Sequence, residues 1–310
     1  MEIIVSNNDR KNERIFYQYK IRVELSKQIS IYNIEDANKT EREQKNMAVK
    51  RIFDWIKNSN SYYDITKGNS ELSIIKFQEL NDSLLIFKLA KKKDLKRTIK
   101  EETFKGYTES DYPYSLVIFD YISQVLYVER NYRVFQFANN MISILQTVLG
   151  AINCNISENS NTKFFVNMIT DSDKFIECYK TFDIVNKVTL SFDSPNSFLG
   201  SKKADDFLNE IRDETQAKKT SMVIQSDEGL LGNGILSFFD EFFTYITNGG
   251  GSWSMSGKPR GKDKKMTKNS KTKIKSLNLT MNISIDQSSV NNANEIIQII
   301  EDQNRFKNEE

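Results

Sequence analysis

The sequence predicts a mixed α+β protein, because two different hydrophobic periodicities occur along the chain. In several segments apolar and polar residues alternate one by one, which is typical of half-buried strands. In others, apolar residues recur every three or four positions, which is typical of amphipathic helices. The chain has 310 residues, of which 38% are hydrophobic, enough for one large domain or two ordinary ones. We expect a largely antiparallel sheet with two helices in the first half, and alternating strands and helices in the second.

The first half begins with its clearest strand pattern. Residues 17–25 alternate apolar with polar side chains, which predicts a half-buried strand. Thr40 and Glu43 form a capping box, so a helix should begin there and run to residue 57. Two hairpins and a second helix should follow: strands 72–80 and 84–89 around a turn at Asn81-Asp82, strands 115–119 and 125–129, and a helix that ends at Gly150.

The second half follows a polar run at residues 157–162. This run predicts a boundary between two domains, 1–156 and 163–310, or a long surface loop within one continuous domain. Beyond it we expect strand 164–169, helix 175–182, strand 188–192, helix 204–211 and strand 221–225. An apolar helix from Leu231 to Ile246 should be central to the core and end at glycines 249–251. A strand at 274–285 and a helix at 290–300 complete the expected order.

Histidine is absent from the chain, which excludes several kinds of chemistry. Nucleophiles activated by histidine, histidine-based zinc hydrolysis and nucleases with a histidine base are all ruled out. Any catalysis would depend on carboxylates, Lys, Tyr or a metal. The cysteines Cys154 and Cys178 are expected to be buried free thiols, as in a reducing cytoplasm. No apolar run is long enough to cross a bilayer, so we expect a cytoplasmic protein with no membrane partner.

A net charge of +2 conceals two strongly basic segments. Residues 258–275 contain nine Lys or Arg against one Asp, and residues 88–100 contain seven against one Asp. The remaining chain therefore carries a net charge of −12. Concentrated positive charge of this kind can bind phosphates even when the overall charge is small. The alternatives are a solvated loop that binds nothing and a contact with an acidic protein partner.

The segment 249–275 is expected to be a basic loop that binds nucleic acid, RNA or DNA, or another polyanion. Three glycines give its start backbone freedom, and Trp253 could stack on a base. The candidate binding residues are Trp253, Lys258, Arg260, Lys262, Lys264, Lys265, Lys268 and Lys271, with Lys91, Lys92 and Lys93 from the first basic segment.

Three carboxylates favour a different hypothesis. Asp171, Asp193 and Asp227 each stand at or just past the end of an expected strand. If those strands were parallel neighbours, the carboxylates would converge and could hold Mg²⁺ or Mn²⁺ for phosphodiester chemistry. The simpler interpretation is that they cap helices or form turns. The sequence has no convincing acid pair with a downstream Glu-x-Lys of the restriction-nuclease kind.

A degenerate pattern of features covers residues 185–285. A strand ends in Ser194-Pro195-Asn196, an acidic helix and a strand follow, and a glycine turn at Asn248-Gly249-Gly250 precedes a basic run. In this order of features the chain resembles an uncharacterised family of bacterial proteins that are similar to components of phage-defence or abortive-infection loci. The resemblance implies a defence role and brings no catalytic residues.

The first hypothesis is therefore a nucleic-acid-binding or regulatory protein that is not an enzyme and needs no cofactor. A second is a Mg²⁺- or Mn²⁺-dependent nuclease that uses the strand-end carboxylates. A third is an assembly subunit whose basic loop docks on an acidic protein surface.

Overall fold

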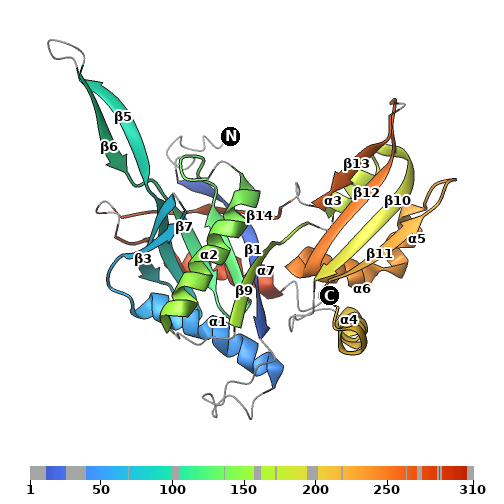
Figure 1. Ribbon diagram of the computed structural model, residues 1–310, viewed down its shortest axis with the longest axis horizontal. Helices are drawn as coiled ribbons and strands as arrows, with labels where there is room; N and C mark the ends of the chain where they lie inside the picture. Colours follow the sequence, from blue (N-terminus) through green and yellow to red (C-terminus); the bar gives the residue numbers. More distant parts are fainter. Residues whose placement is uncertain are drawn as a thin grey trace, which may run out of the picture.

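The computed structural model describes residues 12–25, 40–68, 70–99, 105–135, 137–156, 162–171, 173–193, 202–217, 219–262, 264–270, 274–284, 286 and 288–305. Within these ranges, helices accompany sheets of eight, four and two strands, so the mixed α+β class is confirmed. Figure 1 shows the eight-stranded sheet and its helices on one side of the molecule and the four-stranded sheet on the other.

The eight-stranded sheet is organised around β1. Its strand order is β14-β1-β8-β7-β4-β3-β2, and β9 also pairs with β1. β8 occupies one edge of β1, whereas β14 and β9 follow each other along the opposite edge. The strands are β1 (Glu13–Leu25), β2 (Tyr63–Lys67), β3 (Ser70–Glu79), β4 (Leu84–Lys91), β7 (Tyr114–Asp120), β8 (Val125–Glu129), β9 (Thr162–Met168) and β14 (Ser276–Thr280). β9 and β14, which follow the expected domain boundary in the sequence, thus belong to the first sheet. The division of the chain into two domains stays a prediction.

Helices α1 (Glu41–Asn58) and α2 (Ala138–Ile156) pack on one face of this sheet. Thr40 caps α1 as expected, because its side chain accepts a hydrogen bond from Glu43 N and its own N–H donates to the Glu43 carboxylate. The predicted end of α2 at Gly150 is wrong. Ile152 is fully buried and extends the apolar stripe of Leu145, so packing continues the helix past the glycine.

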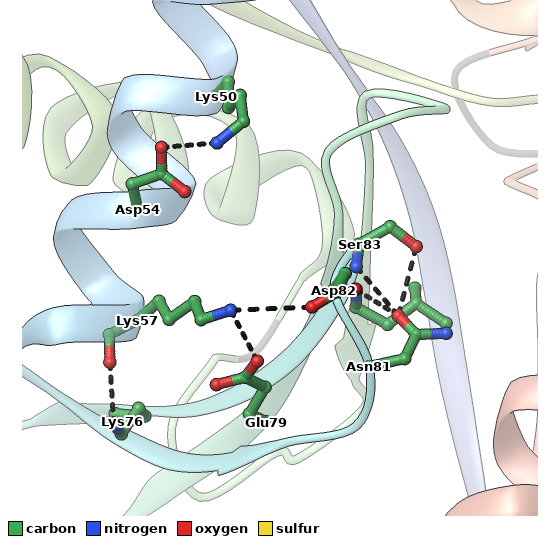
Figure 2. Close-up of polar contacts among 9 residues, drawn as sticks. Lys50, Asp54, Lys57, Lys76, Glu79, Asn81, Asp82 and Ser83 are labelled. Carbon is green, nitrogen blue, oxygen red and sulfur yellow. Dashed lines mark hydrogen bonds and ion pairs between the residues drawn. The ribbon is translucent and has the colours of Figure 1, made fainter.

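The C-terminal end of α1 is tied to the β3–β4 hairpin (Figure 2). Lys57 Nζ lies 2.5 Å from Glu79 Oε1, and the Lys57 carbonyl accepts a hydrogen bond from Lys76 Nζ at 2.7 Å. In the turn, Asn81 Oδ1 accepts hydrogen bonds from the backbone N–H and the hydroxyl of Ser83. These bonds confirm the expected turn, because an Asn side chain here replaces a backbone acceptor.

The opposite face of the sheet is covered in part by helix α7 (Ala293–Arg305). Ile296 and Ile300 are fully buried there, in a cluster with Ile118 of β7 and Tyr127 of β8. Leu84 and Ile86 of β4 belong to the same cluster, and beyond them no described helix covers this face at β2 and the adjoining parts of β3 and β4. β5 (Lys93–Ile99) and β6 (Lys105–Asp111) form a separate two-stranded arm that projects from the sheet (Figure 1).

The four-stranded sheet has the order β11-β10-β12-β13, and every strand pair that it contains is antiparallel. Its strands are β10 (Phe182–Asp193), β11 (Lys219–Gln225), β12 (Gly251–Pro259) and β13 (Met266–Asn269). One face packs on helices α3 (Asp173–Tyr179), α4 (Lys202–Thr215), α5 (Gly232–Phe238) and α6 (Asp240–Tyr245), and on a π-helical segment, η2 (Ile246–Gly250). The alternation of strands and helices in the sequence was correct, but it does not produce a parallel βαβ layer.

Two further expectations need correction. The basic segment expected as a loop over 249–275 is largely the β12–β13 hairpin, because alternate residues such as Trp253 and Met255 are buried in the core. The single long helix expected from Leu231 to Ile246 is broken at Phe239 (φ −112°, ψ 21°) into α5 and α6. Leu231 and Phe238 are exposed, whereas Ile235, Phe242, Phe243 and Ile246 of the same apolar pattern are buried.

The two sheets meet where β9 faces the end of β10. Asn167 in β9 donates hydrogen bonds to Asp193 Oδ2 and to the Gly249 carbonyl, both at 2.8 Å. The Tyr245 hydroxyl donates to the Asp193 carbonyl at 3.0 Å. Gly249 has a φ of +92°, and a Cβ there would lie 2.7 Å from the Cβ of Lys20 in β1. Only glycine fits both the backbone conformation and the close approach.

We expect Gly249→Ala to lower the free energy of unfolding by about 2 kcal/mol, because it adds backbone strain and a steric clash. The matched control is Gly150→Ala in α2, where no heavy atom lies within 4 Å of the added Cβ. This substitution should stabilise the protein by about 0.5–1 kcal/mol through helix propensity. Urea unfolding of both variants measures the two effects, and equal shifts would contradict the packing described for Gly249.

Candidate nucleic-acid interface

The four-stranded sheet has one face that no described helix covers, and hydroxyl groups dominate it. Successive residues of a strand point to opposite faces, so the residues between the buried ones form this outer face. Its hydroxyl side chains, all part-exposed or exposed, lie in register on four strands: Ser221 on β11, Thr189 and Ser191 on β10, Ser252, Ser254 and Ser256 on β12, and Thr267 on β13. Hydroxyls of this kind bind phosphate and sugar oxygens in nucleic-acid complexes.

Lysines stand around this hydroxyl face. Lys187 on β10, Lys219 on β11 and Lys258 on β12 are exposed and belong to the outer set of residues. Asp193 is opposite Lys219, but its carboxylate already accepts the hydrogen bond from Asn167. The outer face is therefore polar with a positive border.

The turn of the β12–β13 hairpin carries the densest positive charge. Arg260, Lys262, Lys264 and Lys265 are exposed there. Arg260 Nε lies 3.8 Å from Asp183 Oδ1, a loose and largely exposed contact. In the part of the chain that the structure describes, Lys262, Lys264 and Lys265 form no ion pair. We call these four residues the hairpin tip.

Lys268 differs from the residues of the hairpin tip. Its Nζ donates a hydrogen bond to Thr181 Oγ1 at 2.7 Å and lies 5.6 Å from the centre of the Phe182 ring. This amine holds β13 against the start of β10, so its role is structural. Lys271, which was also predicted to bind, lies outside the described residues.

Trp253 was predicted to stack on a base, and this prediction is wrong. Its side chain is 1% exposed and packs edge-on against Phe175, with ring centres 5.1 Å apart. The sequence carried the signal for this burial, because Trp253, Met255 and Gly257 alternate with serines. Such alternation is typical of a strand with one face in a core.

Two cations of the first basic segment are paired with carboxylates. Lys92 Nζ lies 2.9 Å from Glu71 Oε2, and Arg97 Nε lies 2.9 Å from Glu109 Oε2 on β6. Lys91 and Lys93 line a polar hollow of about 450 Å³ beside the start of α2. The arm and the β12–β13 hairpin stand at opposite ends of the long axis in Figure 1. The two basic segments therefore do not form one continuous patch.

The strand-end carboxylates do not converge as the metal-site hypothesis required. β10 and β11 are antiparallel, with Asp193 opposite Lys219 and Lys187 opposite Gln225. Asp227 follows the far end of β11, so it is separated from Asp193 by about 20 Å at roughly 3.3 Å per residue. Ligand oxygens must lie within about 2.6 Å of a shared ion. The convergence on which the metal-site hypothesis depended therefore does not occur for Asp193 and Asp227, and the simpler interpretation is favoured.

Asp171 has the role that the simpler interpretation gave it. Its Oδ1 accepts a hydrogen bond from the backbone N–H of Asp173, the first residue of α3. This bond satisfies an N–H group that the short helix leaves free. Among the described residues, no three His, Cys, Asp or Glu side chains are grouped closely enough to hold a metal ion.

One buried carboxyl was not among the predicted residues. The pKa of Asp205, in the first turn of α4, is raised to about 6 by burial and by Asp206, although Arg42 and Lys45 oppose the shift. Its Oδ1 is buried without a hydrogen-bond partner among the described residues. Burial here follows from the packing of α4 beside α1, where Arg212 lies 3.7 Å from Glu41. A local sequence pattern could not have shown it.

The described residues include no helix with both the length and the apolar character needed to cross a membrane. Comparisons with protein-family models, curated proteins and solved structures found no match for the chain.

We expect Asp205→Asn to stabilise the protein at neutral pH. A carboxyl whose pKa is raised on folding binds its proton more tightly in the folded chain, so stability falls as pH rises from about 4 to about 6. An uncharged amide removes this loss, so the free energy of unfolding at neutral pH should rise by on the order of 1 kcal/mol. The gain is small because water screens a partly exposed carboxylate. Urea unfolding should show the gain at pH 7.5 and little of it at pH 4. Exposed Asp213→Asn is the control, and a destabilised Asp205→Asn at pH 7.5 would refute the argument.

Proposed function

We propose that the protein binds nucleic acid through the hairpin tip and the hydroxyl face of the four-stranded sheet. The observation that carries this proposal is the position of the tip. The four exposed cations of the tip belong to the same hairpin as β12, and β12 contributes three serines to the hydroxyl face. A phosphate backbone that crosses the sheet could contact the serines and the tip together.

The composition of the face favours binding that is independent of base sequence. The exposed apolar residues on it are Ile184 and Val223, and no aromatic side chain of the described strands lies on this face. Without aromatic rings, bases cannot be stacked as in single-strand-binding sheets. Contacts from Lys, Arg and Ser to phosphate and sugar fix position without reading sequence.

The biological setting remains part of the proposal. The resemblance of residues 185–285 to an uncharacterised bacterial family, which is itself similar to components of phage-defence loci, supports a bacterial defence role in the cytoplasm, in which binding is the activity. A phage-plating assay with the hairpin variant described next tests whether binding and protection are lost together.

We expect the triple variant Lys262→Glu, Lys264→Glu and Lys265→Glu to lose nucleic-acid binding. For duplex DNA, each lost phosphate contact makes the slope of log K against log salt concentration shallower by about 0.9. Reversing three charges should therefore weaken binding about 100-fold or more. Fluorescence anisotropy with labelled single-stranded RNA, single-stranded DNA and duplex DNA, over a range of salt concentrations, measures the affinity and its dependence on salt.

The matched control is Lys50→Glu, Lys96→Glu and Lys203→Glu, which makes the same change in net charge at exposed sites on α1, the arm and α4. This variant should keep most of the affinity, and thermal unfolding checks that both variants fold. Equal affinity of the two variants would overturn the proposal. Binding to polyglutamate but to none of the nucleic acids would instead indicate an acidic protein partner.

A further inference from the structure

A second open surface lies at the far end of the large sheet. Helix α7 belongs to a cluster that includes Leu84 and Ile86 of β4, and a pocket of about 740 Å³ lies beyond it on the same face, at β2 and the adjoining parts of β3 and β4. Residues of these three strands and Tyr114 of β7 line it, and Ser288 borders it. This volume is in the range of pockets that bind small molecules. We call it the outer-face pocket.

The floor of the outer-face pocket contains a lysine held between aromatic rings. Lys88 Nζ lies 4.5 Å from the centre of the Phe77 ring and 4.9 Å from that of Tyr114. Both rings contribute favourable cation–π contacts. Burial lowers the pKa of the Lys88 amine, since water is partly removed from the ammonium group. An anionic group in the pocket would favour the charged form of this amine.

Two tyrosines at the rim remain exposed. Tyr62 is 71% exposed and Tyr112 is 49% exposed, and both line the pocket. Aromatic side chains in this position can stack on a planar ligand such as a nucleic-acid base. The rings of Phe77 and Tyr114 already contact Lys88, so Tyr62 and Tyr112 are the ones placed for stacking.

A carboxylate stands at the opposite end of the pocket. Asp64 on β2 is opposite Ser73 on β3 and accepts a hydrogen bond from the Ser73 hydroxyl. Ser73 is opposite Ala90, two residues along β4 from Lys88. With strands about 4.8 Å apart and residues about 3.3 Å apart, Asp64 and Lys88 are roughly 12 Å from each other.

The other carboxylate in the lining, Glu71, is neutralised by Lys92 at 2.9 Å. The pocket therefore offers an ammonium group at one end, aromatic rings at the rim, and a carboxylate acceptor at the other end. A ligand that matches has an anionic group, a planar ring, and hydroxyl or amino groups for Asp64.

We propose that the outer-face pocket binds a nucleoside monophosphate. Lys88 contacts the phosphate, Tyr62 or Tyr112 stacks on the base, and Asp64 accepts hydrogen bonds from the sugar hydroxyls or from an amino group of the base. A polymer fits less well, because Asp64 would repel the next phosphate along the chain. This site is separate from the hairpin tip, so the two proposals can fail independently.

The test is isothermal titration of the full-length protein with the four common nucleoside monophosphates, with the corresponding nucleosides, and with inorganic phosphate. At least one monophosphate should bind with a Kd of about 1 mM or tighter, and more tightly than its nucleoside or phosphate alone. Lys88→Met keeps the length of the side chain and removes the charge, so it should weaken that monophosphate about tenfold and leave the nucleoside unchanged.

Two controls keep the result interpretable. Lys96→Met, at an exposed position on the arm, should bind like the unaltered protein, as should the triple hairpin variant. If Lys88→Met does not fold, Tyr112→Ala at the exposed rim provides the second variant, and it should weaken nucleotide and nucleoside alike. The proposal is overturned if no monophosphate binds, if phosphate alone binds as tightly, or if neither pocket variant changes the affinity.

Discussion

The pairing of β1 along both of its edges is the constraint on which the rest of the structure depends. β1 has 13 residues, and Phe16, Tyr19 and Ile21 within it are fully buried. β14 and β9 share one of its edges, although about a hundred residues separate them in the chain. The chain leaves this edge at Thr170 and returns at Ile274, and these two residues form an antiparallel bridge. The four-stranded sheet is therefore formed by a chain segment whose two ends are held together at the Thr170–Ile274 bridge.

The elements that the sequence predicted well are those that pack on a hydrophobic core. The alternation at residues 17–25 and the capping box at Thr40 both lie beside the buried face of the large sheet. The arm was not predicted, because β5 and β6 pair only with each other and have no core to impose a hydrophobic period. The antiparallel direction of the strands in the second sheet also could not be predicted from the sequence. A helix between two strands sets their order in the chain, whereas pairing in space depends on contacts with distant residues.

Among the candidate binding residues, too, the features that were predicted are local in the sequence, and those that were missed depend on how the strands pair. Exposed cations at the hairpin tip were found from composition, since a charged run is exposed in almost any conformation. The three consecutive lysines Lys91, Lys92 and Lys93 could not share one surface, because neighbours on a strand point to opposite faces. Lys92 contacts Glu71, while Lys91 and Lys93 line the hollow beside α2. The outer-face pocket was missed altogether, since its lining comes from four strands that only the folded sheet brings together.

The strand pairing of β12 also explains why the hairpin tip stays available to a partner. Outside the two basic segments the chain carries a net charge of −12, so a flexible basic loop would be drawn onto the protein's own carboxylates. β12 is paired with β10 along its length, and Trp253 anchors it in the core with 1% of its side chain exposed. The hairpin backbone is therefore held in place, so a partner that bound the exposed cations would have to order their side chains but not the strands that carry them. The burial of Trp253, which removes it as a stacking residue, is thus what positions the cations of the tip.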